Sequence, residues 1–140
     1  MIKVVLALIL FLGMSYTPEI TIELPTAKEF DCLVKNVYYE ARGESLMGKV
    51  AVAKVTMNRV KHPNYPKTIC AVVYQHKQFS WTSKPRKAKV NTEEWLASVD
   101  AAVKGYNLEG FEATHYHNMT VRPKWGLHKV GVIGNHIFYM

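Results

Sequence analysis

The chain has 140 residues and a mass of 16.0 kDa, a size that suits one hydrophobic core and would leave two separate cores marginal. Hydrophobic residues make up 49% and charged residues 21%, which excludes a disordered or collagen-like protein. Lys and Arg outnumber Asp and Glu by 18 to 11, so the formal net charge is +7 and we expect an anionic partner. Two cysteines are too few for a disulfide-dense scaffold or a four-thiolate zinc site.

Residues 1–15 have the pattern of a secretory signal. Lys3 gives a short basic start, and an apolar run follows from Val4 to Met14. A helix of that length spans about 16 Å, which suits a signal and is too short for an ordinary membrane span. Small residues permit cleavage after Ser15. We therefore expect export to the periplasm, cell wall or medium, with this segment removed or retained as a membrane anchor. A buried N-terminal helix is the alternative.

Export would place Cys32 and Cys70 in an oxidising compartment, where they can form a disulfide. A bridge between them would close a long loop and contribute about 3–4 kcal/mol on the chain-entropy model. The alternative is that both are small buried residues of apolar helices. Because the sequence gives no Cα separation, both interpretations remain open.

An extended lead-in over residues 16–26 precedes the first predicted helix. Thr26 and Glu29 form a capping box, and apolar residues then recur at helical spacing as far as Ala41. We therefore expect one folded domain over residues 27–140.

Three further helices are predicted. The segment from Gly48 to Val60 is apolar nearly all round, as in a core helix. Thr68 caps a short third helix, and Asn91 with Glu94 opens a fourth. Between these two helices, the polar and basic stretch from Lys77 to Lys89 predicts an exposed loop.

The composition changes after Gly110. Short segments rich in Thr, His, Tyr, Ile and Phe, from Ala113 to His117 and from His136 to Tyr139, predict short strands separated by loops. The predicted fold class is mainly α (α+β), a single domain with a short β or irregular C-terminal part.

Glu40 is a candidate general acid. On a helical wheel it lies on the flank of the apolar stripe that contains Val37. Apolar surroundings raise the pKa of a carboxyl and keep it protonated near neutral pH, which glycosidic cleavage requires. The alternative is that Glu40 and Glu44 are solvated carboxylates at a helix end, one of them paired with Arg42.

A series of short motifs runs through the chain in a fixed order: YEARGE at 39–44, GKVAVA at 48–53, MNRV at 57–60, QFSW at 78–81, ATHY at 113–116 and HIFY at 136–139. Their order and spacing resemble the SleB-like cell-wall hydrolase family, which includes spore-cortex-lytic enzymes and related phage and bacterial proteins. The resemblance covers about residues 31–140. The EARGE and QFSW motifs together make it specific.

The resemblance implies a lysozyme-like, mainly helical fold with a groove for peptidoglycan glycan strands, lytic transglycosylase activity, and Glu40 as the catalytic acid. One carboxyl suffices for this reaction, because the muramyl 6-hydroxyl is the nucleophile and closes an anhydro ring. Hydrolysis usually needs a second carboxylate, and neither Asp31 nor Asp100 is an obvious one.

Other residues are candidates for binding the glycan. Gln78, Ser80, Thr114 and Tyr116 offer hydrogen bonds to sugar hydroxyls and acetamides, and Phe79, Trp81, Trp125 and Tyr139 offer apolar faces for sugar rings. Core packing is the alternative for the aromatic residues, and loop capping is the alternative for Gln78 and Thr114. Glu44 either joins the site or pairs with Arg42 or Arg59.

Two further patterns point to other partners. His115, His117 and His136, with His128 as a substitute, fit a zinc-dependent amidase that cuts the stem peptide, or else they form hydrogen bonds beneath the groove. The basic run from Lys84 to Lys89 is either a solvated loop or a contact for an anionic partner. It fits nucleic-acid phosphates, but export favours attraction to the anionic cell envelope instead.

We therefore expect no metal, no cofactor, no nucleic-acid partner and a monomer. A muramidase that uses water and a non-catalytic wall-binding module remain alternatives, and the sequence leaves phage lysis, wall remodelling and spore germination open.

Overall fold

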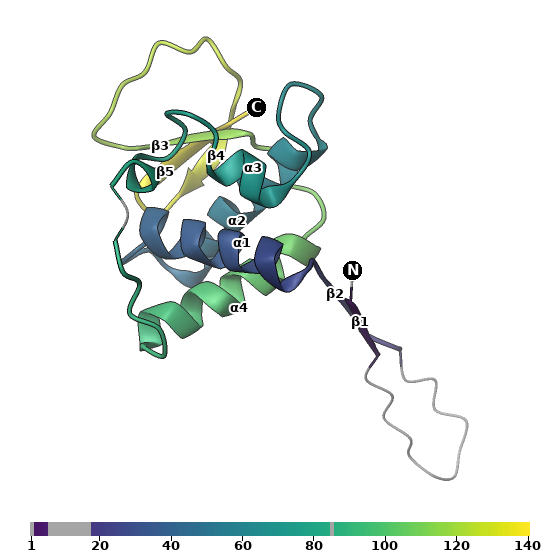
Figure 1. The fold of residues 1–140 in the computed structure, drawn as a ribbon. Coiled ribbons are helices and arrows are strands. Elements are labelled where there is room, and N and C mark those ends of the chain that lie inside the picture. The colour runs from purple at the N-terminus through teal and green to yellow at the C-terminus, as the bar shows by residue number, and fades with distance from the viewer. Residues whose placement is uncertain (1, 6–17, 85) are drawn as a thin grey trace.

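The computed structural model describes residues 2–5, 18–84 and 86–140. Four helices form its body: α1 (Ala27–Glu40), α2 (Leu46–Lys61), α3 (Ile69–Val73) and α4 (Glu93–Asn107) (Figure 1). An antiparallel sheet of β3 (His115–Asn118), β5 (His136–Tyr139) and β4 (Lys129–Ile133), in that order, packs against α2. The predicted mainly helical α+β class with a short C-terminal β part is confirmed.

Side-chain caps begin the helices much as the sequence predicts. The hydroxyls of Thr26 and Thr68 accept hydrogen bonds from backbone amides at the starts of α1 and α3. The start of α4 differs by one residue, because Thr92 is its cap and accepts from the amide of Trp95 at 3.3 Å. Asn91 adopts a positive φ of 65° instead, and so lies in the turn before the helix.

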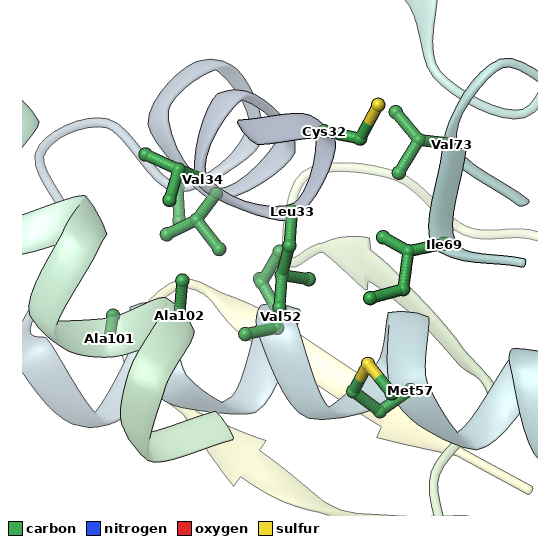
Figure 2. Packing of buried hydrophobic residues seen from close by; sticks show 12 residues of the cluster. Cys32, Leu33, Val34, Val52, Met57, Ile69, Val73, Ala101 and Ala102 are labelled. Carbon is green, nitrogen blue, oxygen red and sulfur yellow. The ribbon is translucent and has the colours of Figure 1, made fainter. Parts of the chain in front are cut away.

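The central element is α2, which is buried on nearly every side, as its apolar sequence predicts. On one side Val52 meets Leu33 of α1 between α3 and α4, as Figure 2 shows. On the other side Ala51 and Val55 pack beneath Phe138 of β5. Because α2 packs against both α1 and the sheet, it fixes the position of α1 relative to β3.

The segment between α3 and α4 is less exposed than its polar and basic composition predicts. Phe79 is only 3% exposed, and Trp81 is half-buried in a short 3₁₀ turn, Ser80–Thr82. The exposed-loop prediction is therefore wrong for these two aromatic residues, which attach the loop to the helices. It holds for the basic residues that follow, including Lys84 and Lys87.

At the N-terminus, β1 (Ile2–Val5) pairs antiparallel with β2 (Thr21–Leu24). The side-chain amide of Asn107 joins β2 to the end of α4, because it accepts from the Glu23 amide at 3.0 Å and donates to the Glu23 carbonyl at 2.9 Å. Most of the predicted signal, including the site after Ser15, lies outside the described residues. Within the described part of the chain, no helix is long and apolar enough to cross a bilayer.

Cys32 and Cys70 form a disulfide that joins α1 to α3. Their Cα atoms are 5.3 Å apart and 38 positions separate them in sequence, so the bond closes a long loop. The open choice between a bridge and two unpaired cysteines is thereby decided for the bridge.

Loss of this disulfide should lower the free energy of unfolding by about 3–4 kcal/mol, because the unfolded chain gains the freedom of the opened loop. Urea unfolding of the Cys32→Ala/Cys70→Ala variant, compared with the oxidised wild type, measures the loss. Reductant should destabilise the wild type to a similar degree and leave the double variant unchanged. A loss below about 1 kcal/mol would contradict the loop-closure account.

Candidate active site

Glu40 is the last residue of α1 and is half-buried. Its Oε2 accepts a hydrogen bond from the Tyr116 hydroxyl of β3 at 3.1 Å. Burial raises the pKa of the Glu40 carboxyl, while the hydrogen bond from Tyr116 and the positive charge of Arg59 lower it; the net effect is a raised pKa. This is the environment that the sequence predicts for a general acid.

Arg59 of α2 connects the segments around this carboxyl. It is 6% exposed, its Nε donates to the Thr114 carbonyl at 2.7 Å, and its Nη1 donates to Oε1 of Gln78 at 3.2 Å. The guanidinium carbon also lies 5.3 Å and 5.5 Å from the ring centroids of Tyr65 and Phe79. The MNRV motif at 57–60 is the sequence signal for this role, which the sequence alone does not assign to Arg59 beyond a candidate pairing with Glu44.

The loop that carries the QFSW motif lies beside the end of α1. Trp81 stacks on Tyr39 with ring centroids 4.7 Å apart, and its Nε1 donates to Oδ1 of Asn36 at 3.0 Å. Gln78 and Ser80 are exposed, so a ligand can reach both side chains. Phe79, by contrast, is buried and presents no face to a sugar, so the packing alternative holds for it.

Thr114 and Tyr116 reach the site in different ways. The backbone carbonyl of Thr114 accepts from Arg59, and its hydroxyl lies 3.0 Å from Nδ1 of His115. The hydroxyl of Tyr116 is committed to Glu40. Tyr116 is therefore a direct hydrogen-bond partner of the Glu40 carboxyl, whereas Thr114 contributes through its backbone carbonyl, which holds Arg59 in place.

Trp125 and Tyr139 lie on the opposite face of the sheet from Tyr116. Tyr116 pairs with Phe138, which is buried against α2, and strand alternation turns Tyr139 and His117 to the other side. There the Tyr139 hydroxyl lies 2.9 Å from Nε2 of His117, and the Trp125 ring lies 5.7 Å from that of Tyr139. The structure therefore does not bring these two aromatic residues together with Glu40.

The same alternation separates the three histidines of the zinc hypothesis. His115 and His117 lie on the outer face, whereas His136 lies on the inner face beside Tyr116, with ring centroids 5.2 Å apart. Among the residues that the structure describes, no group of three or more His, Cys, Asp or Glu side chains is placed to hold a metal. The described residues therefore do not bring the three histidines of the zinc hypothesis to one site.

Glu44 fastens the turn between β4 and β5. Its side chain is 9% exposed, and its Oε1 lies 3.8 Å from Nδ1 of His136. Its Oε2 accepts from the Asn135 amide at 3.4 Å, and a Cβ at Gly134 would collide with the same oxygen. Of the two interpretations of Glu44, the ion pair with Arg42 or Arg59 is not seen among the described residues, because the chain folds the β4–β5 turn onto this carboxyl instead.

Comparison with known proteins gives a family. Residues 43–139 match a family model described as Cell Wall Hydrolase. The chain belongs to this family. Glu40 itself lies just before the matched range, while Glu44, Arg59, Gln78 and Tyr116 lie within it.

Curated relatives include spore cortex-lytic enzymes. The chain is 29% identical over 112 residues to the one from Bacillus cereus and 31% identical over 109 residues to the one from Bacillus subtilis. These alignments cover 79% and 76% of this chain but only 43% and 35% of the relatives. The chain therefore spans less than half the length of the curated relatives that it matches.

Two solved structures share the fold. The catalytic domain of the germination-specific lytic transglycosylase SleB from Bacillus anthracis superposes with a TM-score of 0.71 at 28% identity, covering 84% of this chain and 100% of that one. The catalytic domain of SleB from Bacillus cereus gives 0.69 at 26% identity, covering 91% and 100%. The fold is that of the SleB catalytic domains, so the lysozyme-like expectation is confirmed.

Gly134→Ala should destabilise the protein by more than about 1 kcal/mol, because an alanine there adopts an unfavourable positive φ and displaces the Glu44 carboxylate. Gly126→Ala is the matched control, since Gly126 also has a positive φ of 65° but no atom within 4 Å of the added Cβ. Thermal unfolding of both variants measures the difference. Equal losses would show that the contact with Glu44 is unimportant.

Tyr116→Phe should raise the pKa of Glu40 further, because it removes a hydrogen bond that favours the carboxylate. NMR titration of the Glu40 carboxyl carbon measures this shift. Tyr139→Phe, on the opposite face of the sheet, should leave the Glu40 titration unchanged. A Glu40 pKa that stays the same or falls in Tyr116→Phe would contradict the assigned hydrogen bond.

Proposed function

We propose that the chain is a peptidoglycan-cleaving enzyme, a lytic transglycosylase that breaks the bond between N-acetylmuramic acid and N-acetylglucosamine. The observation that carries this proposal is the half-buried Glu40 carboxyl, with its raised pKa and its hydrogen bond from Tyr116. Membership of the cell wall hydrolase family and the likeness to a lytic transglycosylase catalytic domain support it.

In the first step, protonated Glu40 donates its proton to the glycosidic oxygen, and the bond from that oxygen to the muramyl anomeric carbon breaks. Because Oε2 already accepts a hydrogen bond from Tyr116, we assign the donated proton to Oε1. The new carboxylate is stabilised by the Tyr116 hydroxyl and the charge of Arg59, the same two groups that lower its pKa.

In the second step, the Glu40 carboxylate accepts the proton of the muramyl 6-hydroxyl while that oxygen bonds to the anomeric carbon. The products are a 1,6-anhydromuramyl end and a free N-acetylglucosamine end, and no water is consumed. The carboxyl returns to its protonated form, so one group serves as acid and then as base.

A muramidase is the alternative that the sequence leaves open, and the three carboxylates weighed as its second acidic group are engaged elsewhere. Asp31 lies 2.6 Å from Nζ of Lys35, and Asp100 lies 2.8 Å from Nζ of Lys104, on exposed helix faces. Glu44 is committed to the β4–β5 turn. None of these three carboxylates is offered to a water molecule opposite Glu40, as hydrolysis usually requires.

The setting that we propose is outside the cytoplasm, with the chain acting as a monomer on the anionic cell envelope. The Cys32–Cys70 disulfide supports export, because such bonds persist in oxidising compartments. The net charge of +7 supports attraction to an anionic wall, which should weaken as salt rises.

Glu40→Gln should abolish clearing of purified peptidoglycan in zymograms, because an amide has no proton to donate. Mass spectrometry of wild-type products should find reducing ends lighter by the mass of one water, which marks the anhydro ring. Glu109→Gln, a change at an exposed carboxyl, is the matched control and should retain activity. Full activity in Glu40→Gln would refute the role of Glu40, and hydrated ends would favour the muramidase.

Loss of activity in Glu40→Gln should not reflect unfolding. A raised pKa means that the folded state holds the proton more tightly than the unfolded state, so stability from this group is lost as pH rises through the folded pKa. At neutral pH the variant should therefore be at least as stable as the wild type, and the difference should shrink toward pH 4, near the usual carboxyl pKa of about 4.3. Urea unfolding at both pH values checks this.

A further inference from the structure

A pocket of about 590 Å³ opens on the exposed side of α1, between that helix, the end of α3 and the loop that leads to α4. Its volume lies in the range of small-molecule and peptide side-chain sites. Four of its lining residues are aromatic: Tyr39, Tyr74, Trp81 and Trp95. We call it the aromatic pocket. Glu40 is not among its lining residues.

The aromatic residues of the pocket lining offer carbon surface to a ligand. The Nε1 of Trp81 donates to Asn36, and the hydroxyl of Tyr39 donates to the backbone carbonyl of Arg86. The polar atoms of both rings are therefore satisfied within the protein. Tyr74 packs edge-on against Trp81, with centroids 5.6 Å apart, which completes a surface suited to methyl and methylene groups.

The charged residues of the lining are mostly cationic. Lys35, Arg86 and Lys87 line the pocket together with one carboxylate, Asp31. Asp31 is neutralised by Lys35 at 2.6 Å, whereas Arg86 and Lys87 form no ion pair with any residue that the structure describes. A ligand with small apolar groups and one or more carboxylates would match both the aromatic and the cationic residues of the lining.

The aromatic pocket adjoins the site of Glu40 through the chain itself. Tyr39 directly precedes Glu40, and Trp81 directly follows Ser80, the exposed residue of the QFSW loop. A muramyl residue held at Glu40 carries a lactyl group, and that group bears a peptide stem with methyl side chains and carboxylates. A stem on a muramyl residue held at Glu40 would start one residue along α1 from Tyr39, and it has the chemistry that the pocket lining accepts.

We propose that the aromatic pocket binds the carboxylate-bearing peptide stem of the strand that Glu40 cleaves, with Arg86 and Lys87 contacting its carboxylates. The proposal rests on the proposed function, which it deepens by making the peptide part of the recognised substrate. It predicts that peptide-bearing strands bind more tightly than glycan strands stripped of peptide.

The kinetic test compares peptide-bearing strands with strands from which an amidase has removed the peptides. Arg86→Gln/Lys87→Gln should raise KM about three- to tenfold on peptide-bearing strands, with kcat unchanged, and should not alter KM on stripped strands. Lys84→Gln/Lys89→Gln is the matched control, because it removes two charges from the same loop at residues that do not line the pocket. It should affect both substrates alike.

A binding test uses a soluble disaccharide-peptide and the indole N–H signals of the three tryptophans. The signals of Trp81 and Trp95 should shift, and that of Trp125, on the far face of the sheet, should not. Equal KM changes in the two double variants would overturn the peptide pocket and leave the proposed function intact. So would tryptophan shifts that appear with polyglycerol phosphate, an anionic polymer without peptide, and not with the disaccharide-peptide. Failure of the wild type to cut either substrate would instead overturn the proposed function, on which the pocket proposal rests.

Discussion

Arg59 places a guanidinium inside the protein, where withdrawal of a charge from water costs several kcal/mol unless its N–H groups are hydrogen-bonded. Its partners, the Thr114 carbonyl and the Gln78 side chain, come from positions 55 and 19 residues away. Since burial is favourable only with both partners in place, this cation fixes the QFSW loop and the start of β3 against α2. Tyr116 follows two residues after Thr114, so its hydroxyl is held over Glu40 as a consequence.

Glu40 is subject to opposing effects, and the proposed reaction depends on their balance. Burial favours the neutral acid and adds a cost to the carboxylate that forms during cleavage. Tyr116 and Arg59 offset part of that cost by stabilising the carboxylate. A group that gives up a proton in one step and accepts one in the next needs both influences, because neither protonation state can be much more stable than the other.

Structural features that depend on neighbouring residues can be predicted from this sequence, and features that depend on distant contacts cannot. Thr26 and Thr68 start their helices through hydrogen bonds to amides three residues away, so the pattern contains the whole interaction. The partner of Glu44 lies 91 residues away in a turn, and no local pattern encodes it. The face that Tyr139 presents depends on the β3–β5 register. The sequence does not predict the strand β4, because its glycine and the register shift at Lys129/Gly131 weaken the alternation of apolar and polar residues that marks a strand.

The helical period of α1 assigns three successive residues to three different tasks. Each residue is rotated by about 100° from the one before, so Tyr38 points into the protein, where it is 2% exposed. Tyr39 faces the aromatic pocket, and Glu40 faces Tyr116. Because the pocket and the acid belong to one rigid helix end, their separation is fixed by backbone geometry. A peptide stem held at Tyr39 would therefore select which sugar linkage lies at Glu40, and the same strand could not shift by one sugar without leaving the pocket.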